Sequence, residues 1–117
     1  MIRTEAVTAL FLQKAKVARR AYAIVLAARS YAAGFNPDGI AVTSETILNK
    51  IIVETLREAN VNRNDVEYIE THGTGTEVGD RQEVKALSDV FCENRDEPLF
   101  IGSIKSNIGH TEASSGE

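Results

Sequence analysis

The chain has 117 residues, of which 43% are hydrophobic and 26% charged, with a formal net charge of −4 at pH 7. This composition is typical of a globular domain and excludes disordered and fibrous proteins. No apolar stretch reaches the roughly 18–20 residues that a membrane-spanning helix needs. The acidic balance disfavours nucleic-acid binding, which needs a basic face, and a single cysteine permits no intrachain disulfide. We therefore expect a soluble cytoplasmic protein with no membrane span and no nucleic-acid partner.

Two short apolar runs lie near the N-terminus. Residues 5–13 and 22–29 have the length and the β-branched and aromatic content of buried strands, although their Ala and Leu content leaves helix open. The basic segment between them, residues 14–20, is interpreted as a solvated turn or short helix rather than a phosphate-binding patch. Residues 34–39, Gly-Phe-Asn-Pro-Asp-Gly, predict a loop between two substructures.

The clearest helix of the chain follows this loop. Ser44 is its candidate N-cap, and the polar run at residues 60–65 ends it. Its apolar residues recur at helical spacing, with charged residues on the opposite face. They are Ile47, Leu48, Ile51, Ile52, Leu56 and Ala59.

The second half of the chain alternates between predicted strands and helices. Residues 66–71 and 99–104 are rich in β-branched and aromatic residues and predict two strands. Asp80 is a candidate N-cap for the helix between them, whose apolar stripe comprises Val84, Leu87, Val90 and Phe91. A loop at residues 105–110 follows the second strand, and Thr111 is expected to open another helix. This order indicates α/β architecture with parallel strands.

The sequence contains only two histidines, His72 and His110, and each comes just after a predicted strand, beside glycines. Ligands gather at the carboxyl ends of strands in an open α/β sheet, so neighbouring parallel strands would bring both imidazoles to one edge. Imidazole exchanges protons near neutral pH, and its N–H group can stabilise a developing oxyanion. We interpret both as catalytic candidates. The alternative is that each is a loop histidine bonded only to backbone.

Three further polar residues accompany these histidines. Lys105, in the string Lys-Ser-Asn-Ile-Gly-His, could orient a carboxylate or raise the positive potential, and a solvated surface lysine is the alternative. Thr74 and Thr76 alternate with Gly73 and Gly75 in a loop that a ligand can approach closely. The glycine spacing misses the dinucleotide-binding pattern by one residue and no P-loop follows, which disfavours a nucleotide site.

Cys92 is the only thiol in the sequence. It lies late in the predicted second helix, without the helix N-terminus or neighbouring base that activates a catalytic thiol. We therefore predict a small buried core residue. Cys92 and the two histidines lack the ligand spacing of a zinc site, so no metal is predicted.

The stretch from residue 66 to residue 116 resembles the β-ketoacyl synthase, or condensing-enzyme, family. The matching strings are Tyr-Ile-Glu-Thr-His-Gly-Thr-Gly-Thr (68–76), Val-Gly-Asp-Arg-Gln-Glu-Val (78–84) and Ile-Gly-Ser-Ile-Lys-Ser-Asn-Ile-Gly-His-Thr-Glu-Ala-Ser-Ser-Gly (101–116). Residues 3–65 resemble the preceding family segment more weakly. Phe-Leu-Gln-Lys-Ala (11–15) and Val-Phe-Cys (90–92) are most similar to the ketosynthase region of animal-type multifunctional fatty acid synthase.

The resemblance implies part of a thiolase-like α/β fold and a decarboxylative condensation of acyl and malonyl thioesters. It implies that His72, His110 and Lys105 are catalytic: the two histidines support malonyl decarboxylation and stabilise the enolate oxygen, and Lys105 organises the site. Thr74 and Thr76 would hold the phosphopantetheine arm of an acyl carrier protein, which is the expected partner. No directly bound cofactor is implied, and the family is usually homodimeric.

The sequence lacks the family's nucleophile string of the Thr-Ala-Cys-Ser-Ser type, and Cys92 does not occupy that position. We therefore expect a fragment of a 3-oxoacyl-[acyl-carrier-protein] synthase of fatty acid biosynthesis that is inactive alone. Residues 1–43 would close the N-terminal half of the fold, and residues 44–117 would open the C-terminal half. The alternatives are a fragment of a polyketide synthase and a non-catalytic α/β interaction module.

Overall fold

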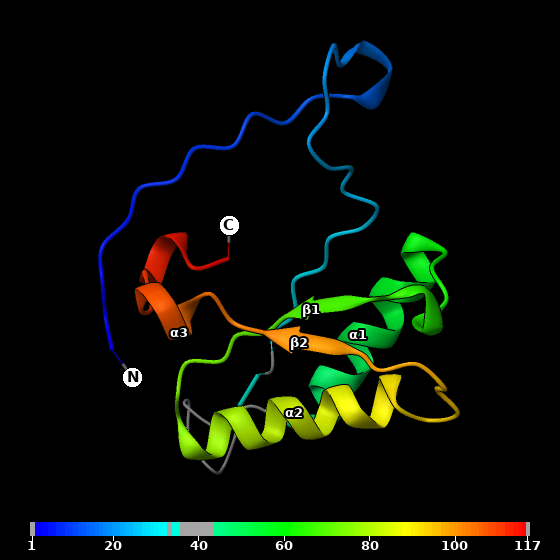
Figure 1. Cartoon of the computed structure of the whole chain (residues 1–117), viewed down its shortest axis with the longest axis vertical. Helices are drawn as coiled ribbons and strands as arrows, with labels where there is room; N and C mark the ends of the chain where they lie inside the picture. The colour runs from blue at the N-terminus through cyan, green and yellow to red at the C-terminus, as the bar shows by residue number, and fades with distance from the viewer. Residues whose placement is uncertain (1, 33, 36–43, 117) are drawn as a thin grey trace.

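The computed structural model describes residues 2–32, 34–35 and 44–116 of the chain (Figure 1). Most of its helices and strands lie in the last of these ranges. In chain order they are η1 (Ala15–Val17), α1 (Glu45–Ala59), η2 (Arg63–Asp65), β1 (Tyr68–Glu70), α2 (Glu77–Phe91), β2 (Phe100–Gly102), α3 (Lys105–Ile108) and η3 (Glu112–Ser114), where η denotes a 3-10 helix.

The two strands form a parallel sheet, as predicted. Tyr68 pairs with Phe100, and Glu70 pairs with Gly102 two residues further on. Parallel neighbours need a crossover connection, and α2 provides it while packing against α1. The strand–helix–strand order therefore confirms the α/β architecture, although each strand has only three residues.

A small apolar core lies between α1, α2 and the sheet. Leu87, Val90 and Phe91 of α2 are buried. Partly buried side chains from neighbouring elements pack against them, namely Ile52, Leu56, Val66, Ile69 and Leu99. Val84 belongs to the predicted stripe but is 49% exposed, since these partners gather around the C-terminal half of α2.

The ends of the two long helices agree only partly with the predicted caps. Helix α1 follows Ser44 as predicted, although the Ser44 side chain makes no capping hydrogen bond, and Asn60 ends it at φ 53°. Helix α2 begins at Glu77, three residues before the predicted cap. Asp80 instead accepts a hydrogen bond from the Gly75 N–H at 3.3 Å. The Asp80 carboxylate therefore holds the preceding loop rather than the first amides of the helix.

Two predictions near the C-terminus were wrong in detail. The predicted loop at residues 105–110 contains one helical turn, α3, which ends at Gly109 with φ 80°. The segment from Thr111 forms the single 3-10 turn η3 instead of an α-helix over the described residues.

Cys92 is exposed, so the prediction of a buried core residue was wrong. It is the C-cap of α2 and directly follows the buried Phe91. Successive residues of an α-helix point about 100° apart, because one turn takes 3.6 residues. Val90 and Phe91 both face the core, so the middle of the buried face lies between them, and the next residue, Cys92, points about 150° away from it.

The predicted strands at residues 5–13 and 22–29 are absent, which is the largest correction. Both runs are extended and exposed, and with η1 between them they form an open arm that bends away from the rest of the chain (Figure 1). Phe11 and Tyr22 on this arm are 88% and 89% exposed. A strand needs a neighbour for its backbone hydrogen bonds, and no described residue pairs with either run.

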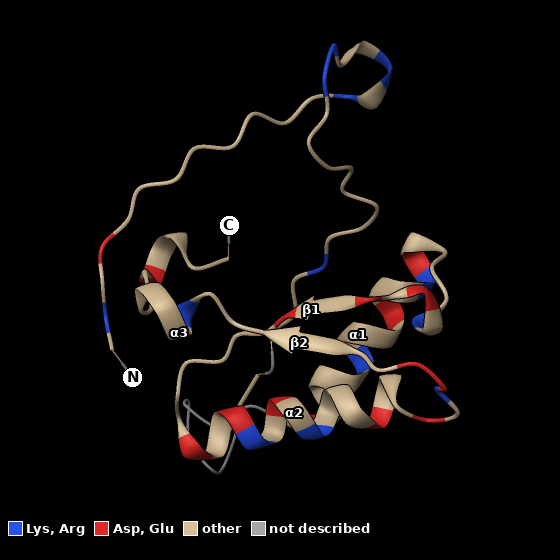
Figure 2. Cartoon of the chain, in the orientation of Figure 1, with Lys and Arg blue, Asp and Glu red and all other residues tan. Residues whose placement is uncertain are grey.

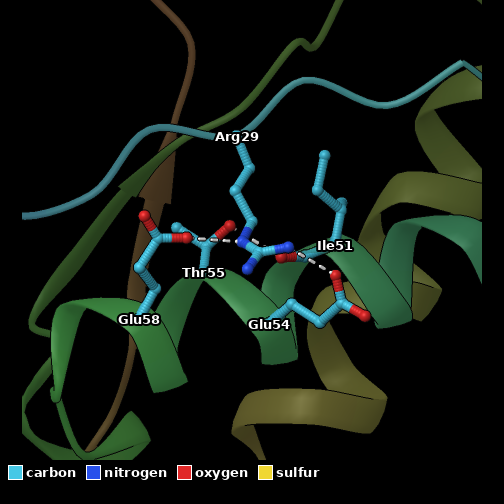
Figure 3. Close-up of polar contacts among 5 residues, drawn as sticks. All are labelled: Arg29, Ile51, Glu54, Thr55 and Glu58. Atoms are coloured by element: carbon cyan, nitrogen blue, oxygen red, sulfur yellow. Dashed lines mark hydrogen bonds and ion pairs between the residues drawn. The ribbon is translucent and has the colours of Figure 1, made fainter.

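Contacts hold the arm at its two ends. Arg29 donates hydrogen bonds to Glu58 and Glu54 of α1, both at 2.7 Å (Figure 3), while residues 2–6 contact the loop that carries His110. The bend between these ends presents exposed basic side chains (Figure 2).

Most of the turn predicted at residues 34–39 lies outside the described residues. Among those described, no helix combines the length and apolarity needed to cross a membrane.

Candidate active site

The structure brings His72 and His110 together. His72 follows β1 by one residue past Thr71, and His110 follows the short helix α3 after β2. The centres of their rings lie 5.4 Å apart, with the ring planes at 89°. Because β1 and β2 run parallel, their carboxyl ends open on the same side, where α3 also lies (Figure 1). His72 and His110 are 38 positions apart in the sequence, and the pairing of β1 with β2 brings them together.

A carboxylate on α2 fixes the backbone of the first histidine loop. Glu83 accepts hydrogen bonds from the His72 N–H at 2.6 Å and from the Gly73 N–H at 2.9 Å. Gly73 has φ 45°, and a Cβ at this position would lie 2.7 Å from the Ser103 Cβ atom. The loop therefore fits against the chain after β2 only if residue 73 is glycine.

The backbone of His110 is fixed by the N-terminal segment. The His110 N–H donates to the Ile2 carbonyl at 2.8 Å, and the Thr4 N–H donates to the His110 carbonyl at 3.0 Å. These two bonds form a parallel bridge between Arg3 and His110. Gly109 permits this approach, because a Cβ there would lie 3.2 Å from the Ile2 carbonyl oxygen. The second histidine is thus held by residues more than 100 positions away in the sequence.

The imidazole of His110 has a defined hydrogen-bonding direction. Its Nδ1 atom accepts a hydrogen bond from the Glu112 N–H at 3.3 Å. A neutral imidazole that accepts at Nδ1 carries its proton on Nε2. The Nε2–H group of His110 is therefore assigned as the donor that remains available to a ligand.

Lys105 and His72 line the same open hollow, which has a volume of about 440 Å³. Its lining comprises Glu70, Thr71, His72, Ile104, Lys105, Ser115 and Gly116. Both signs of charge are therefore present, with a carboxylate on β1 and an ammonium group on α3. His110 is not part of the lining but contacts the ring of His72 at its edge.

Hydrogen bonds stabilise the negative charge of Glu70. The Tyr68 hydroxyl donates to its Oε2 atom at 2.5 Å and the Ile104 N–H donates to its Oε1 atom at 2.7 Å. These two bonds, with a smaller contribution from the charge of Lys105, lower the pKa of Glu70. Because Tyr68 loses its bond to Glu70 on ionising, the pKa of Tyr68 is raised. Glu70 thus stays charged and connects β1 to the start of α3.

The two threonines lie apart from this hollow. Thr74 and Thr76 are within 3.4 Å of each other through their hydroxyl oxygens, and neither lines the hollow. Thr76 is the N-cap of α2 and makes no capping hydrogen bond with its side chain. Both threonines lie in the loop that connects β1 to α2, between His72 and the first residue of the helix.

Three acidic residues of the site were not predicted from the sequence. Glu83 reaches its partners from ten and eleven residues away, Glu70 bonds across to a residue 34 positions later, and Glu112 contacts Arg3 at 2.9 Å. No short-range spacing reveals such contacts. The only sequence signal was their presence inside the quoted motif strings, where they stand beside the histidines, glycines and lysine.

A solved structure shows which fold surrounds this arrangement. The oxazolomycin ketosynthase domain OzmH KS8 of Streptomyces albus JA3453 superposes with a TM-score of 0.62 and 35% sequence identity. The match covers 67% of this chain and 21% of the solved chain. The fold is therefore the α/β, thiolase-like fold of ketosynthases, of which this chain covers a part.

The sequence comparisons agree with the fold. Residues 22–117 match the family described as Beta-ketoacyl synthase, C-terminal domain. The chain therefore belongs to the β-ketoacyl synthase family. The fatty acid synthase of the goose Anser anser anser is 46% identical over 114 residues, which are 97% of this chain and 32% of that sequence. Erythronolide synthase EryA3 of Saccharopolyspora erythraea is 43% identical over 113 residues, which are 92% of this chain and 4% of that sequence.

Proposed function

We propose that this chain is part of a 3-oxoacyl-[acyl-carrier-protein] synthase that condenses acyl and malonyl thioesters in fatty acid biosynthesis, with loss of CO₂. The observation that carries the proposal is the edge-to-face pair of His72 and His110 at 5.4 Å. The 46% identity to a fatty acid synthase over 97% of the chain supports it. The corresponding parent is a cytoplasmic, homodimeric acyltransferase that works with an acyl carrier protein.

The two imidazoles would act on the decarboxylation step. The bond between the malonyl carboxylate and the methylene carbon breaks, CO₂ leaves, and the electron pair forms an enolate with negative charge on the thioester oxygen. The Nε2–H group of His110 and a ring N–H of His72 are the donors proposed for this oxygen. Removing one such donor costs roughly 10²–10³ in rate in other enzymes.

The other site residues would bind rather than react. The Lys105 ammonium group lines the hollow beside His72 and would attract the malonyl carboxylate by charge. Thr74 and Thr76 lie outside the hollow. We assign them to the phosphopantetheine arm that delivers the thioester because their His-Gly-Thr-Gly-Thr string resembles the family's. The domain organisation is proposed in the same way, with residues 1–43 from the end of one half of the fold and residues 44–117 from the start of the other.

The thiol that receives the acyl group would come from elsewhere in the synthase. Cys92 is exposed at the C-terminal end of α2, whereas a nucleophilic thiol is activated by a helix N-terminus or a neighbouring base. The sequence holds no other cysteine. The purified 117-residue chain should therefore form no acyl-enzyme with an acyl thioester, as measured by intact mass spectrometry. A stable acyl adduct would contradict this.

Malonyl decarboxylation by the complete synthase tests the role of the histidines. We expect His72→Ala and His110→Ala each to lower the rate by roughly 10²–10³, while His110→Gln, which keeps an N–H donor, should lose less. Release of CO₂ from a malonyl thioester is the measurement. An unchanged rate in either alanine variant would remove that histidine from the mechanism and favour a non-catalytic module.

The similarity to EryA3 favours a second candidate, a polyketide synthase. Its ketosynthase region would use the same histidine pair, and the distinction lies in the product. Mass spectrometry of the carrier-bound product distinguishes a fully reduced acyl chain, as in fatty acid synthesis, from a chain that retains oxygen functions.

A further inference from the structure

The open hollow of the candidate site begins where the hydrogen-bond ladder between β1 and β2 ends. At one end of the ladder the Phe100 N–H donates to the Glu67 carbonyl at 3.1 Å, and at the other end the Thr71 N–H donates to the Gly102 carbonyl at 2.8 Å. Both bonds fit a single parallel register. If the ladder continued in this register, the next bond would run from the Ile104 N–H to the Thr71 carbonyl.

The Ile104 N–H donates to the side chain of Glu70 instead. Its partner is the Oε1 atom of Glu70, at 2.7 Å, so a carboxylate oxygen takes the place of the next backbone acceptor. The other carboxylate oxygen, Oε2, accepts a hydrogen bond from the Tyr68 hydroxyl at 2.5 Å. Tyr68 and Glu70 stand two residues apart on β1 and therefore share a face of the strand. Both oxygens of this exposed carboxylate are thus held by hydrogen bonds.

Gly102 leaves the space that this arrangement needs. It stands opposite Glu70 in the strand register. A Cβ at Gly102 would lie 2.8 Å from the Tyr68 hydroxyl oxygen and 3.4 Å from a carbon of the Tyr68 ring. The tyrosine therefore lies across the glycine, and a side chain at position 102 would push its hydroxyl away from Glu70.

We propose that Glu70 is a positioning residue that ends the β1–β2 ladder and holds the turn carrying Lys105 against β1. Ile104 is the N-cap of α3, and Lys105 is the first residue of that helix. Both line the hollow together with Glu70 and His72. Fixing the Ile104 N–H fixes the point where α3 leaves the sheet, and so keeps Lys105 on the wall beside His72. Glu70 touches no reacting atom in this scheme.

The consequence for malonyl thioesters rests on the proposed function, whereas the identity of the hydrogen-bond acceptor does not. NMR of the 117-residue chain identifies that acceptor. A scalar coupling through the hydrogen bond should connect the Ile104 ¹⁵N nucleus to the side-chain carboxyl carbon of Glu70, with the bond from Thr71 to Gly102 as the internal reference. A coupling from Ile104 to the Thr71 carbonyl carbon would overturn the proposal, because the ladder would then continue past Glu70.

Substitution of Glu70 tests whether the carboxylate holds the turn. Glu67→Ala is the matched control, since Glu67 is also exposed and enters the ladder only through its backbone carbonyl, which alanine keeps. The backbone chemical shifts of residues 104–107 should move in Glu70→Ala, move less in Tyr68→Phe, and stay near the parent values in Glu67→Ala. Glu70→Gln retains an acceptor oxygen and should stay closer to the parent than Glu70→Ala does. Equal shifts in Glu70→Ala and Glu67→Ala would overturn the proposal.

The kinetics of the complete synthase separate position from charge. Glu70→Ala should raise KM for the malonyl thioester about two- to tenfold with kcat little changed, a range that corresponds to the typical net strength of one hydrogen bond. KM for the acyl thioester should stay constant, because that substrate has no carboxylate for Lys105 to attract. Glu70→Gln keeps the acceptor and removes a negative charge from the hollow, so its malonyl KM should equal the parent value or fall below it. A malonyl KM raised as much in Glu70→Gln as in Glu70→Ala would overturn the positioning role.

The two measurements also distinguish this inference from the proposed function. A displaced turn in Glu70→Ala with an unchanged malonyl KM would support the positioning by Glu70 and count against the proposed binding of malonyl by Lys105. An unmoved turn would overturn the positioning role alone, because the alanine variants of the two histidines test the function independently.

Discussion

The arm at residues 2–32 and the compact region at residues 44–116 both contain large apolar side chains, but these are exposed on the arm and partly or fully buried in the core of the compact region. Phe11 on the arm is 88% exposed, whereas Phe91 on α2 is 4% exposed. Phe11 stands in the apolar run at residues 5–13, and Phe91 stands in the apolar stripe predicted for the second helix. Helix α2 has α1 and the sheet as neighbours, while the middle of the arm has none among the described residues. The difference teaches that apolar composition predicts burial only where a second element is available to pack against.

Truncating one phenylalanine in each region should give the largest contrast. We expect Phe91→Ala to lower the free energy of unfolding by about 3–5 kcal/mol, because it leaves a cavity in a core of few residues. Phe11→Ala should change it by less than about 0.5 kcal/mol, as is usual for exposed positions. Urea denaturation of the 117-residue chain measures both. A comparable loss in Phe11→Ala would show that the arm packs against a partner in solution.

Glycine substitutions sharpen the comparison within the histidine loop. Gly73→Ala would place a Cβ 2.7 Å from the Ser103 Cβ atom at φ 45°, whereas Gly75→Ala would meet nothing within 4 Å at φ 77°. Both variants carry backbone strain of about 1–3 kcal/mol, and only Gly73→Ala adds the clash. We expect the larger loss of unfolding free energy, and loss of the contact between the two imidazoles by NMR, in Gly73→Ala. Equal losses would argue against the close packing of this loop.

The attachment of the arm to α1 should depend on Arg29. Arg29→Gln removes the ion pairs to Glu54 and Glu58, whose side chains are partly exposed. The expected loss of unfolding free energy is about 1 kcal/mol or less. Arg57 lies in the same surface hollow and forms no ion pair with a described residue, so Arg57→Gln is the control and should have less effect. A larger loss of unfolding free energy in Arg57→Gln than in Arg29→Gln would show that the overall charge of the hollow stabilises the fold more than the ion pairs of Arg29 do.

The smallest expected effect is a pH dependence of the compact region. A hydrogen bond from Lys85 lowers the pKa of Asp89, and the same bond raises the pKa of Lys85. A carboxyl group with a lowered folded-state pKa stabilises the fold above its unfolded value and loses this contribution as pH falls, here below about pH 4. For Lys85 the sign is opposite, so its contribution is lost above about pH 10.4.

The free energy of unfolding should therefore decline slightly below about pH 4 and again above about pH 10.4. Asp89→Asn should flatten the acidic decline. Glu70, whose pKa is lowered mainly by the Tyr68 hydrogen bond, should contribute to the same decline, so Glu70→Gln should flatten it further. A decline that is unaffected by either variant would assign it to other carboxylates.

The parts of the fold that were predicted correctly depend on local signals. The apolar spacing from Ile47 to Ala59 gave the helix α1, and the β-rich runs around Ile69 and Ile101 gave the two strands with their parallel direction. The N-cap of α2 was predicted four residues too late, at Asp80 instead of Thr76, and Asp80 bonds to the loop before the helix rather than to its first amides. Cap chemistry permits either arrangement, and only packing selects between them.

The candidate site was also predicted only in part from the sequence. His72, His110 and Lys105 were named from the sequence because imidazole, amine and glycine stand together after predicted strands. The partners Glu83, Glu112 and Arg3 were not, since their contacts join segments from ten to 109 residues apart. Side-chain periodicity carries no information about contacts across such separations.

The sequence by itself determined the class of fold, the family and the residue types of the site, because these depend on periodicity and on motif strings that are local in the chain. Only the tertiary structure decided which apolar runs are buried, which way the imidazole of His110 points, and what holds each histidine loop. The physical reason is that burial and hydrogen bonding need a partner in space, and the parallel pairing of β1 with β2 is what brings those partners within reach.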